Sequence, residues 1–150
     1  MQVVLFEPEI PTNTGSVARL CAATLTPLHL IEPLGFKIDD KHLKRAGLDY
    51  WPFVDLHVHE DWQQFLDQVK PARLLYFTKK AELSYTSIRY REGDFLVFGP
   101  ETRGLPAIIW QDQTDRALRI PMSGTGVRSL NLSNAVSIVL YEGLRQLGRT

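Results

Sequence analysis

What this sequence lacks narrows the functions open to it. Its 150 residues include one cysteine, Cys21, so neither an internal disulfide nor a cysteine-based zinc cluster can form. We expect Cys21 in the core, since it lies on the apolar stripe of a predicted helix. Basic and acidic residues both number 17, so the net charge gives no long-range attraction for a polyanion. Contact with nucleic acid would therefore depend on local groups of basic residues.

Long apolar runs and the common nucleotide-binding patterns are absent too. No stretch approaches 18 apolar residues, and "MQVVLFEPEIP" has neither a basic start nor a small-residue cleavage site. We therefore expect no membrane span, no secretion signal and a cytoplasmic location. The sequence lacks a strand-linked G-x-G-x-x-G, a G-x-x-x-x-G-K-S/T and a G-x-S-x-G. A conventional dinucleotide site, a P-loop and an α/β-hydrolase are accordingly disfavoured.

Alternating strand and helix patterns predict the fold class. Short β-branched or aromatic runs predict strands at residues 2–6, 28–32, 54–58, 73–78, 94–99 and 117–121. Apolar residues at helical spacing predict helices at residues 14–25, 61–69 and 131–147. This order favours an α/β fold with helices on both faces of a mostly parallel sheet. The length and the absence of a visible linker predict a single domain over residues 1–150.

The first polar segment is "PEIPTNTGSVARL", residues 8–20. Asn13 or Thr14 suits the N-cap of the first helix, and Gly15 allows another backbone or a ligand to approach its first turn. Arg19 points away from the apolar stripe by roughly 100° or more, given 3.6 residues per turn. Taken alone, an ordinary capped helix with a surface arginine explains this segment more simply than a ligand site.

The second polar segment is "FGPETRGLP", residues 98–106. It places a carboxylate, a hydroxyl and a guanidinium in a loop after a buried strand. Ligands of open α/β sheets bind outside the carboxyl ends of the strands, where this loop is expected to lie. Glu101 is either part of a ligand site or a structural acceptor for loop N–H groups.

The third polar segment is "RIPMSGTGVRSLNLSNAVSIVLYE", residues 119–142, in which a loop rich in Gly, Ser and Thr leads into the last helix. Asn131 and Ser133 are expected to cap this helix. A second stripe of the helix is polar but poor in lysine and glutamate, which suits a partner subunit or a nucleotide. Its members are Asn134, Ser137, Tyr141 and Arg145.

The remaining signals are weaker. Lys41, Lys44 and Arg45 share one helical face, which is either a phosphate contact or a solvated surface. His57 and His59 lie on one strand face without an evident third ligand, so metal binding is not favoured.

Together, "NTGSVAR", "FGPETRGLP" and "RIPM…RSLNLSNAVSIVLYE" resemble, in this order, the three motifs of the SPOUT class of RNA methyltransferases. With "VLFEPEIPTNTG" and "KRAGLDYW", the chain resembles the small stand-alone tRNA (cytidine/uridine) 2′-O-methyltransferases of the wobble nucleotide over nearly its full length. The resemblance implies a trefoil-knotted α/β fold that acts as a homodimer. It further implies methyl transfer from S-adenosyl-L-methionine, without a metal, to the ribose of nucleotide 34 in the anticodon stem-loop of tRNA, with leucine isoacceptors as the expected substrates.

The resemblance also assigns roles to residues. The implied catalytic residue is Arg19, and the implied cofactor contacts are Phe77, Gly99, Ile120, Ser129 and Leu130. The residues implied to support the motifs are Asn13, Gly15, Glu101, Gly104, Asn131 and Asn134. The implied RNA contacts are Lys41, Lys44, Arg45 and Tyr141. We expect a Gly99→Val substitution to fill ligand space and leave the fold largely intact.

Two aspects of the implied reaction stay open. A guanidinium is a reluctant base, so Arg19 either takes the proton of the 2′-hydroxyl or stabilises the alkoxide and holds a phosphate while another group takes the proton. The alternatives for the whole chain are a SPOUT enzyme that methylates another RNA position or a base, and a non-catalytic RNA-binding module. The Gly-rich "SGTGV" departs from the pattern expected of the family, which leaves the geometry of this loop open.

Overall fold

The protein is built on an open parallel sheet. The computed structural model describes residues 1–39, 41 and 50–150. Its strands are β1 (Gln2–Phe6), β2 (Leu28–Ile31), β3 (Leu56–His59), β4 (Arg73–Phe77), β5 (Leu83–Ser84), β6 (Asp94–Phe98) and β7 (Ala117–Arg119). They lie in the order β3-β2-β1-β6-β4-β7-β5, and every pairing is parallel. The α/β class with a parallel sheet is therefore confirmed.

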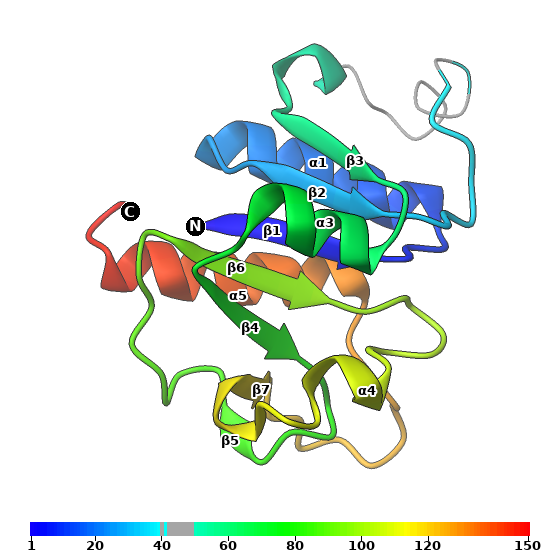
Figure 1. The fold of residues 1–150 in the computed structure, drawn as a ribbon. Coiled ribbons are helices and arrows are strands. Elements are labelled where there is room, and N and C mark those ends of the chain that lie inside the picture. Colours follow the sequence, from blue (N-terminus) through cyan, green and yellow to red (C-terminus); the bar gives the residue numbers. More distant parts are fainter. Residues whose placement is uncertain (40, 42–49) are drawn as a thin grey trace.

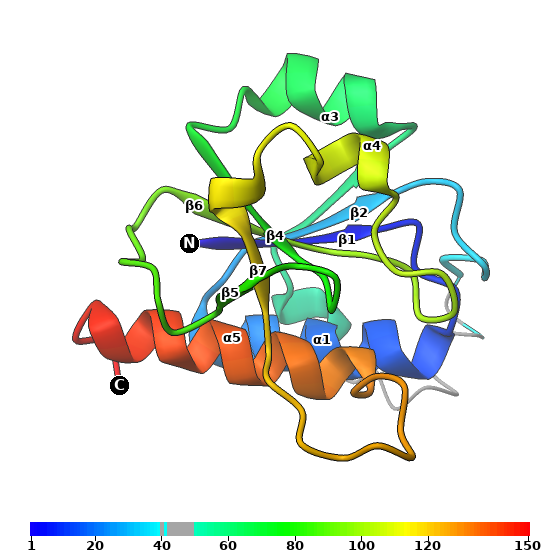
Figure 2. The same cartoon turned by 90° about the horizontal axis from the view of Figure 1, so that it is seen from below.

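Helices cover both faces of this sheet, as Figures 1 and 2 show. The α-helices are α1 (Pro11–Thr24), α3 (Trp62–Val69), α4 (Ala107–Trp110) and α5 (Leu132–Gln146), and short 3₁₀ helices are η1 (Trp51–Phe53) and η2 (Thr114–Arg116). In Figure 2, α1 and α5 lie side by side on one face, and α3 and α4 lie on the other. The central strands read as continuous apolar runs because they are covered on both faces.

Each face of the sheet has its own hydrophobic core. Val17 and Cys21 of α1 pack with Val136 and Leu140 of α5 against one face. Burial raises the pKa of the Cys21 thiol to about 12, which agrees with its predicted place in the core. On the other face, Phe65 of α3 is buried in a second hydrophobic cluster. The apolar stripes predicted for these helices are the faces that pack on the sheet.

Two features of the elements differ from the sequence-based expectation. Helix α1 begins at Pro11, with Ile10 as a cap residue that makes no side-chain hydrogen bond, so the prediction of Asn13 or Thr14 as N-cap is wrong. Proline at the first helical position has its φ already set and needs no N–H partner, so the helix starts earlier and buries Asn13 and Thr14 in its first turn. Strand β3 starts two residues later than predicted because η1 occupies the chain before it.

The other predicted strands and helices are present with shifts of a few residues at their ends, and Asn131 caps α5 as expected. The prediction that Ser133 also caps α5 is wrong, because Ser133 lies inside the helix and donates its N–H to Asn131. Strand β5 and the 3₁₀ helices η1 and η2 were not predicted. No helix in the part of the chain that the structure describes is long and apolar enough to cross a membrane.

Candidate functional site

A cavity opens at the carboxyl ends of three neighbouring strands. Its volume is about 730 Å³, within the range of small-molecule sites. Strands β4, β6 and β7 end at its wall, and the chain after each strand contributes to it. The lining comprises residues 77–80, 98–105 and 128–132, together with Ile10, Asn13, Leu118, Ile120, Met122 and Ala135. Segments that are far apart in the sequence therefore meet where ligands of open α/β sheets bind.

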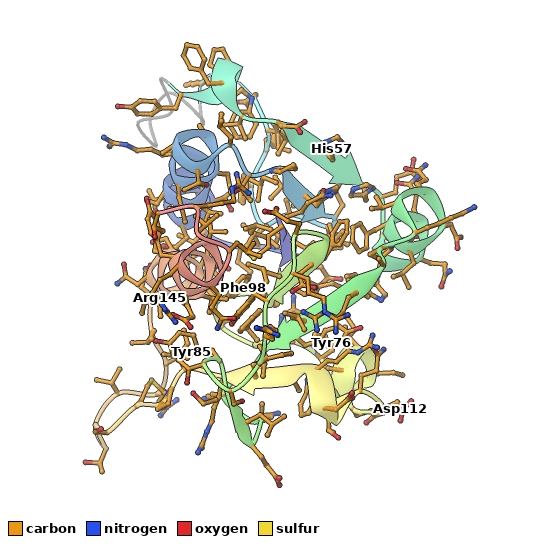
Figure 3. The ribbon with its side chains drawn as sticks, turned by 90° about the vertical axis from the view of Figure 1, so that its left-hand side faces the viewer. His57, Tyr76, Tyr85, Phe98, Asp112 and Arg145 are labelled. Carbon is orange, nitrogen blue, oxygen red and sulfur yellow. The ribbon has the colours of Figure 1, made fainter. Side chains whose placement is uncertain are left out.

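The floor of the cavity is apolar. The rings of Phe77 and Phe98 stack with their centroids 4.8 Å apart and their planes at 15°, and both side chains are buried. Figure 3 shows Phe98 inside the molecule, between β6 and α5. Leu118 and Ile120 extend this surface from β7 and the residue after it. A floor of this kind suits the flat, apolar face of an aromatic ligand.

The rim is basic. Lys79, Lys80, Arg103 and Arg128 all line the cavity. The Lys79 ammonium donates a hydrogen bond to the Arg128 carbonyl at 3.3 Å, which ties the chain after β4 to the segment before α5. Arg103 lies 3.1 Å from a carboxylate oxygen of Glu7. Arg103 also lies 3.6 Å from Glu9, so carboxylates offset its charge. Lys79, Lys80 and Arg128 pair with no carboxylate among the described residues, and they give the cavity the local basic character that the overall composition lacks.

The backbone of residues 122–130 offers unused donors. None of the hydrogen bonds found among the described residues is donated by an N–H group of this segment, although residues 128–130 line the cavity. Unpaired backbone donors beside a cavity can bind oxygen or nitrogen atoms of a ligand.

Side-chain hydrogen bonds join the three motif segments. Glu101 accepts from the backbone N–H groups of Glu9 at 2.7 Å and Ile10 at 3.1 Å, and from the Asn13 amide at 3.4 Å. Asn13 in turn accepts from the Asn131 amide at 2.9 Å. Of the two interpretations left open for Glu101, the structure therefore supports the structural acceptor. The carboxylate fixes the loop before α1 next to the start of α5.

Two glycines in the second motif are required by the backbone. A Cβ atom at Gly99 would lie 2.2 Å from the Leu105 nitrogen and 2.4 Å from the Gly104 carbonyl carbon. The expectation that Gly99→Val leaves the fold largely intact is therefore wrong, because the added atoms would collide with the main chain of residues 104 and 105. Gly104 has a φ of +68°, which side chains with a Cβ rarely adopt.

The structure gathers most, though not all, of the residues singled out in the sequence. All five implied cofactor contacts line the cavity, as do Asn13, Glu101, Gly104 and Asn131. Gly15, Asn134 and Tyr141 do not, and Arg19 stands exposed on α1 with its guanidinium 4.7 Å from the centre of the Tyr50 ring. Lys41 is exposed, whereas Lys44 and Arg45 lie outside the described residues.

Sequence reasoning missed Thr78, Lys79 and Lys80 as lining residues. Their position directly after a buried strand is the signal that pointed to residues 98–106, and it applies equally to "TKK" after "RLLYF".

The two histidines considered for metal binding have another partner. His59 and the buried His29 are hydrogen-bonded at 2.9 Å between ring nitrogens, and His57 lies 2.9 Å from Asp55. The described residues contain no group of three or more His, Cys, Asp or Glu side chains placed to hold a metal ion.

Comparison with known proteins identifies the family. The model of the SpoU rRNA methylase family matches residues 1–141. The chain belongs to the SpoU rRNA methylase family. It is 54% identical, over 154 residues, to tRNA (cytidine(34)-2′-O)-methyltransferase of Yersinia pestis, covering 99% of this chain and 94% of that one. It is 52% identical to the enzyme of the same name from Escherichia coli K12, with the same coverage.

Solved structures share the fold of this chain. One, described as giving structural insights into 2-OH methylation of C/U34 on tRNA, has a TM-score of 0.88 at 49% identity and covers 99% of this chain and 97% of that one. The SpoU methyltransferase AviRb from Streptomyces viridochromogenes, in complex with AdoMet, has a TM-score of 0.84 at 23% identity and covers 100% of this chain and 61% of that one. The resemblance to SPOUT methyltransferases is thereby confirmed for the family and the fold.

Proposed function

We propose that this protein transfers a methyl group from S-adenosyl-L-methionine to the ribose 2′-hydroxyl of nucleotide 34 in tRNA. Leucine isoacceptors are the substrates that we expect. The observation that carries the proposal is that the three motif segments converge on one cavity, in a chain at least 52% identical to two tRNA (cytidine(34)-2′-O)-methyltransferases. The match covers 99% of this chain and 94% of each of those two enzymes.

The cavity fits the proposed cofactor in its chemistry. Phe77, Phe98 and Ile120 offer an apolar surface for adenine, and the backbone around Ser129 and Leu130 offers N–H donors for its polar atoms. Gly99 lets residues 104–105 approach the end of β6 and so shapes the wall. When bound, S-adenosylmethionine supplies an electrophilic methyl group on a sulfonium.

The protein's own part in the reaction is alignment and charge stabilisation. A ribose 2′-hydroxyl is a weak nucleophile, so it must be oriented and its developing negative charge must be stabilised. We assign this role to Arg19, whose planar fork can hold a ribose oxygen and a phosphate together. The pH dependence of the transfer rate tests whether Arg19 also accepts the proton.

Arg19 does not line the cavity of its own chain. Of the residues at the start of α1, Ile10 and Asn13 line the cavity. Arg19 lies six residues beyond Asn13, about 9 Å further along the helix at 1.5 Å per residue. We propose that the protein is a homodimer in which Arg19 of one copy serves the cavity of the other. Helix α5, beside α1, presents Ile138 and Tyr141 as exposed hydrophobic side chains that suit such a contact.

Basic residues supply the contact with RNA. Lys41, Lys44 and Arg45 remain our candidates for phosphate binding, and the basic rim of the cavity adds Lys80 and Arg128. An anticodon loop presents unpaired bases, which is the form of RNA that proteins read most readily.

The test is methyl transfer to an anticodon stem-loop, followed by nucleoside mass spectrometry. We expect a single 2′-O-methyl group at position 34. Arg19→Ala should slow single-turnover transfer by about 10²- to 10³-fold, as for other preorganised donors, while S-adenosylmethionine affinity stays unchanged. Arg19→Lys should rescue little, because an ammonium lacks the planar fork.

Each other outcome has a distinct meaning. Methylation at another position or on a base would replace the proposed substrate with that of a different RNA methylase. RNA binding without any methyl transfer would leave only the non-catalytic module. Wild-type transfer by Arg19→Ala would remove Arg19 from the mechanism.

A further inference from the structure

Arg19 is restrained by an aromatic ring. Its guanidinium carbon lies 4.7 Å from the centroid of the Tyr50 ring. Tyr50 immediately precedes η1, and η1 packs beside α1. The short helix therefore places the Tyr50 ring next to Arg19. Tyr50 is 38% exposed, and the pair therefore lies at the surface.

This contact differs from those of the paired arginines. Arg73, Arg103, Arg145 and Arg149 each pair with a carboxylate. Within residues 1–39, 41 and 50–150, no carboxylate lies at ion-pair distance from Arg19. A carboxylate occupies N–H donors of a guanidinium and offsets its charge. A ring face attracts the cation without occupying its N–H donors as a carboxylate does, so these donors stay available to a ligand.

We propose that Tyr50 is a positioning residue for methyl transfer: its ring fixes the guanidinium plane of Arg19 while leaving the donors free for the ribose and phosphate oxygens of bound RNA. This rests on the role of Arg19 in the proposed function. A long arginine side chain loses rotamer freedom when it binds, so restraint before binding reduces the free energy lost in the transition state. Charge is retained as well, because an aromatic face attracts a cation without neutralising it.

The experiment compares Tyr50→Phe, Tyr50→Leu and Tyr50→Met in single-turnover transfer at saturating S-adenosylmethionine and anticodon stem-loop. Phe keeps the ring and should retain the wild-type rate. Leu and Met lack it and should be about two- to fivefold slower, the rate equivalent of an exposed cation–π contact. Phe53→Leu is the matched control, since Phe53 lies in the same turn, is 74% exposed and makes no ring contact with Arg19, so its rate should stay at the wild-type value.

A double-mutant cycle separates this proposal from the one on which it rests. In the Arg19→Ala background, Tyr50→Leu should cause no further loss of rate. An equal loss in both backgrounds would overturn the role of Tyr50 and leave that of Arg19 intact. A wild-type rate for Arg19→Ala would instead overturn the role of Arg19, and the role of Tyr50 with it.

A measurement without RNA or catalysis tests the contact itself. The NMR signal of the Arg19 Nε–H group should be displaced by the Tyr50 ring current in the wild type and in Tyr50→Phe, and should return toward the value of a solvated arginine in Tyr50→Leu and Tyr50→Met. A signal that stays in place when the ring is removed would overturn the proposal, whatever the transfer rates.

Discussion

Among single side chains, His29 links the fold most directly to pH. It is buried, and its Nε2 lies 2.6 Å from the Gln2 amide oxygen, so this nitrogen donates and Nδ1 accepts from Nε2 of His59 at 2.9 Å. Burial, and then the neighbouring His57 and His59, lower the pKa of His29 from 6.5 to about 3. Between these pH values the unfolded chain binds a proton that the folded chain does not. We therefore expect the free energy of unfolding to fall as the pH drops from 6.5 toward 3.

Urea unfolding at several pH values measures this effect. The contribution of one such group is at most about 1.4 kcal/mol per pH unit. His29→Gln should flatten the pH dependence in this window, because it removes the buried group whose pKa is lowered. An unchanged slope in His29→Gln would assign the acid sensitivity to other groups.

Helix α5 depends on one asparagine that also supports the cavity. Asn131 accepts from the N–H of Ser133 at 2.9 Å and donates to Asn13 at 2.9 Å. Asn131→Ala should lower the free energy of unfolding by about 1 kcal/mol through the lost cap. It should also weaken S-adenosylmethionine binding by roughly three- to tenfold, because the link between the motifs is worth about one hydrogen bond. Calorimetry and urea unfolding give the two quantities separately.

Asn131→Ser is the matched variant. A serine oxygen still caps the helix but is too short to reach Asn13, so stability should return while cofactor affinity stays low. Wild-type affinity in this variant would show that the link to Asn13 does not support the cavity.

The same helices show what sequence patterns can and cannot predict. The apolar stripe of α5 and its asparagine cap are local signals, and both were found in the sequence. The start of α1 was misplaced because two good capping residues, Asn13 and Thr14, lie buried inside the helix, where the Asn13 side chain bonds to Asn131 instead of capping. Strand β5 has two residues, too few for any periodicity, and forms because β7 pairs with it across the sheet.

The sequence also predicted some parts of the candidate site and missed others. Gly-rich and polar segments after strands were visible, and the resemblance named five residues that share one cavity. Lys79 and Lys80 follow a buried strand, so the signal that pointed to residues 98–106 applied to them too, and only their place at the cavity depends on packing. The separation of Arg19 from the cavity likewise depends on packing, because helical spacing predicts the face of a residue and not the distance of that face from a site on another element. The trefoil knot stays a prediction.

Because Arg19 lies away from the cavity of its own chain, mixing two inactive variants tests whether the arginine of one chain serves the cavity of the other. Arg19→Ala removes the arginine, and Ile120→Trp fills the cavity from the residue after β7; each variant alone should be nearly inactive. If the arginine of one copy serves the cavity of the other, a heterodimer of the two variants contains one intact site. An equimolar mixture, dissociated and reassembled, should then recover about a quarter of the wild-type sites, because half of the dimers are mixed and each has one working site of two.

Sedimentation should give twice the 17.1 kDa chain mass for the wild type and for both variants. No recovery in the mixture would mean that Arg19 acts within its own chain, and a fully active monomer would contradict the dimer itself.

Tyr141→Ala supplies the control for assembly, since this side chain is 49% exposed on α5 and lies outside the cavity. If α5 forms the interface, this variant should dissociate at higher concentration than the wild type, and its transfer rate should fall with dilution as the dimer separates, because each cavity then loses the arginine that the other chain provides.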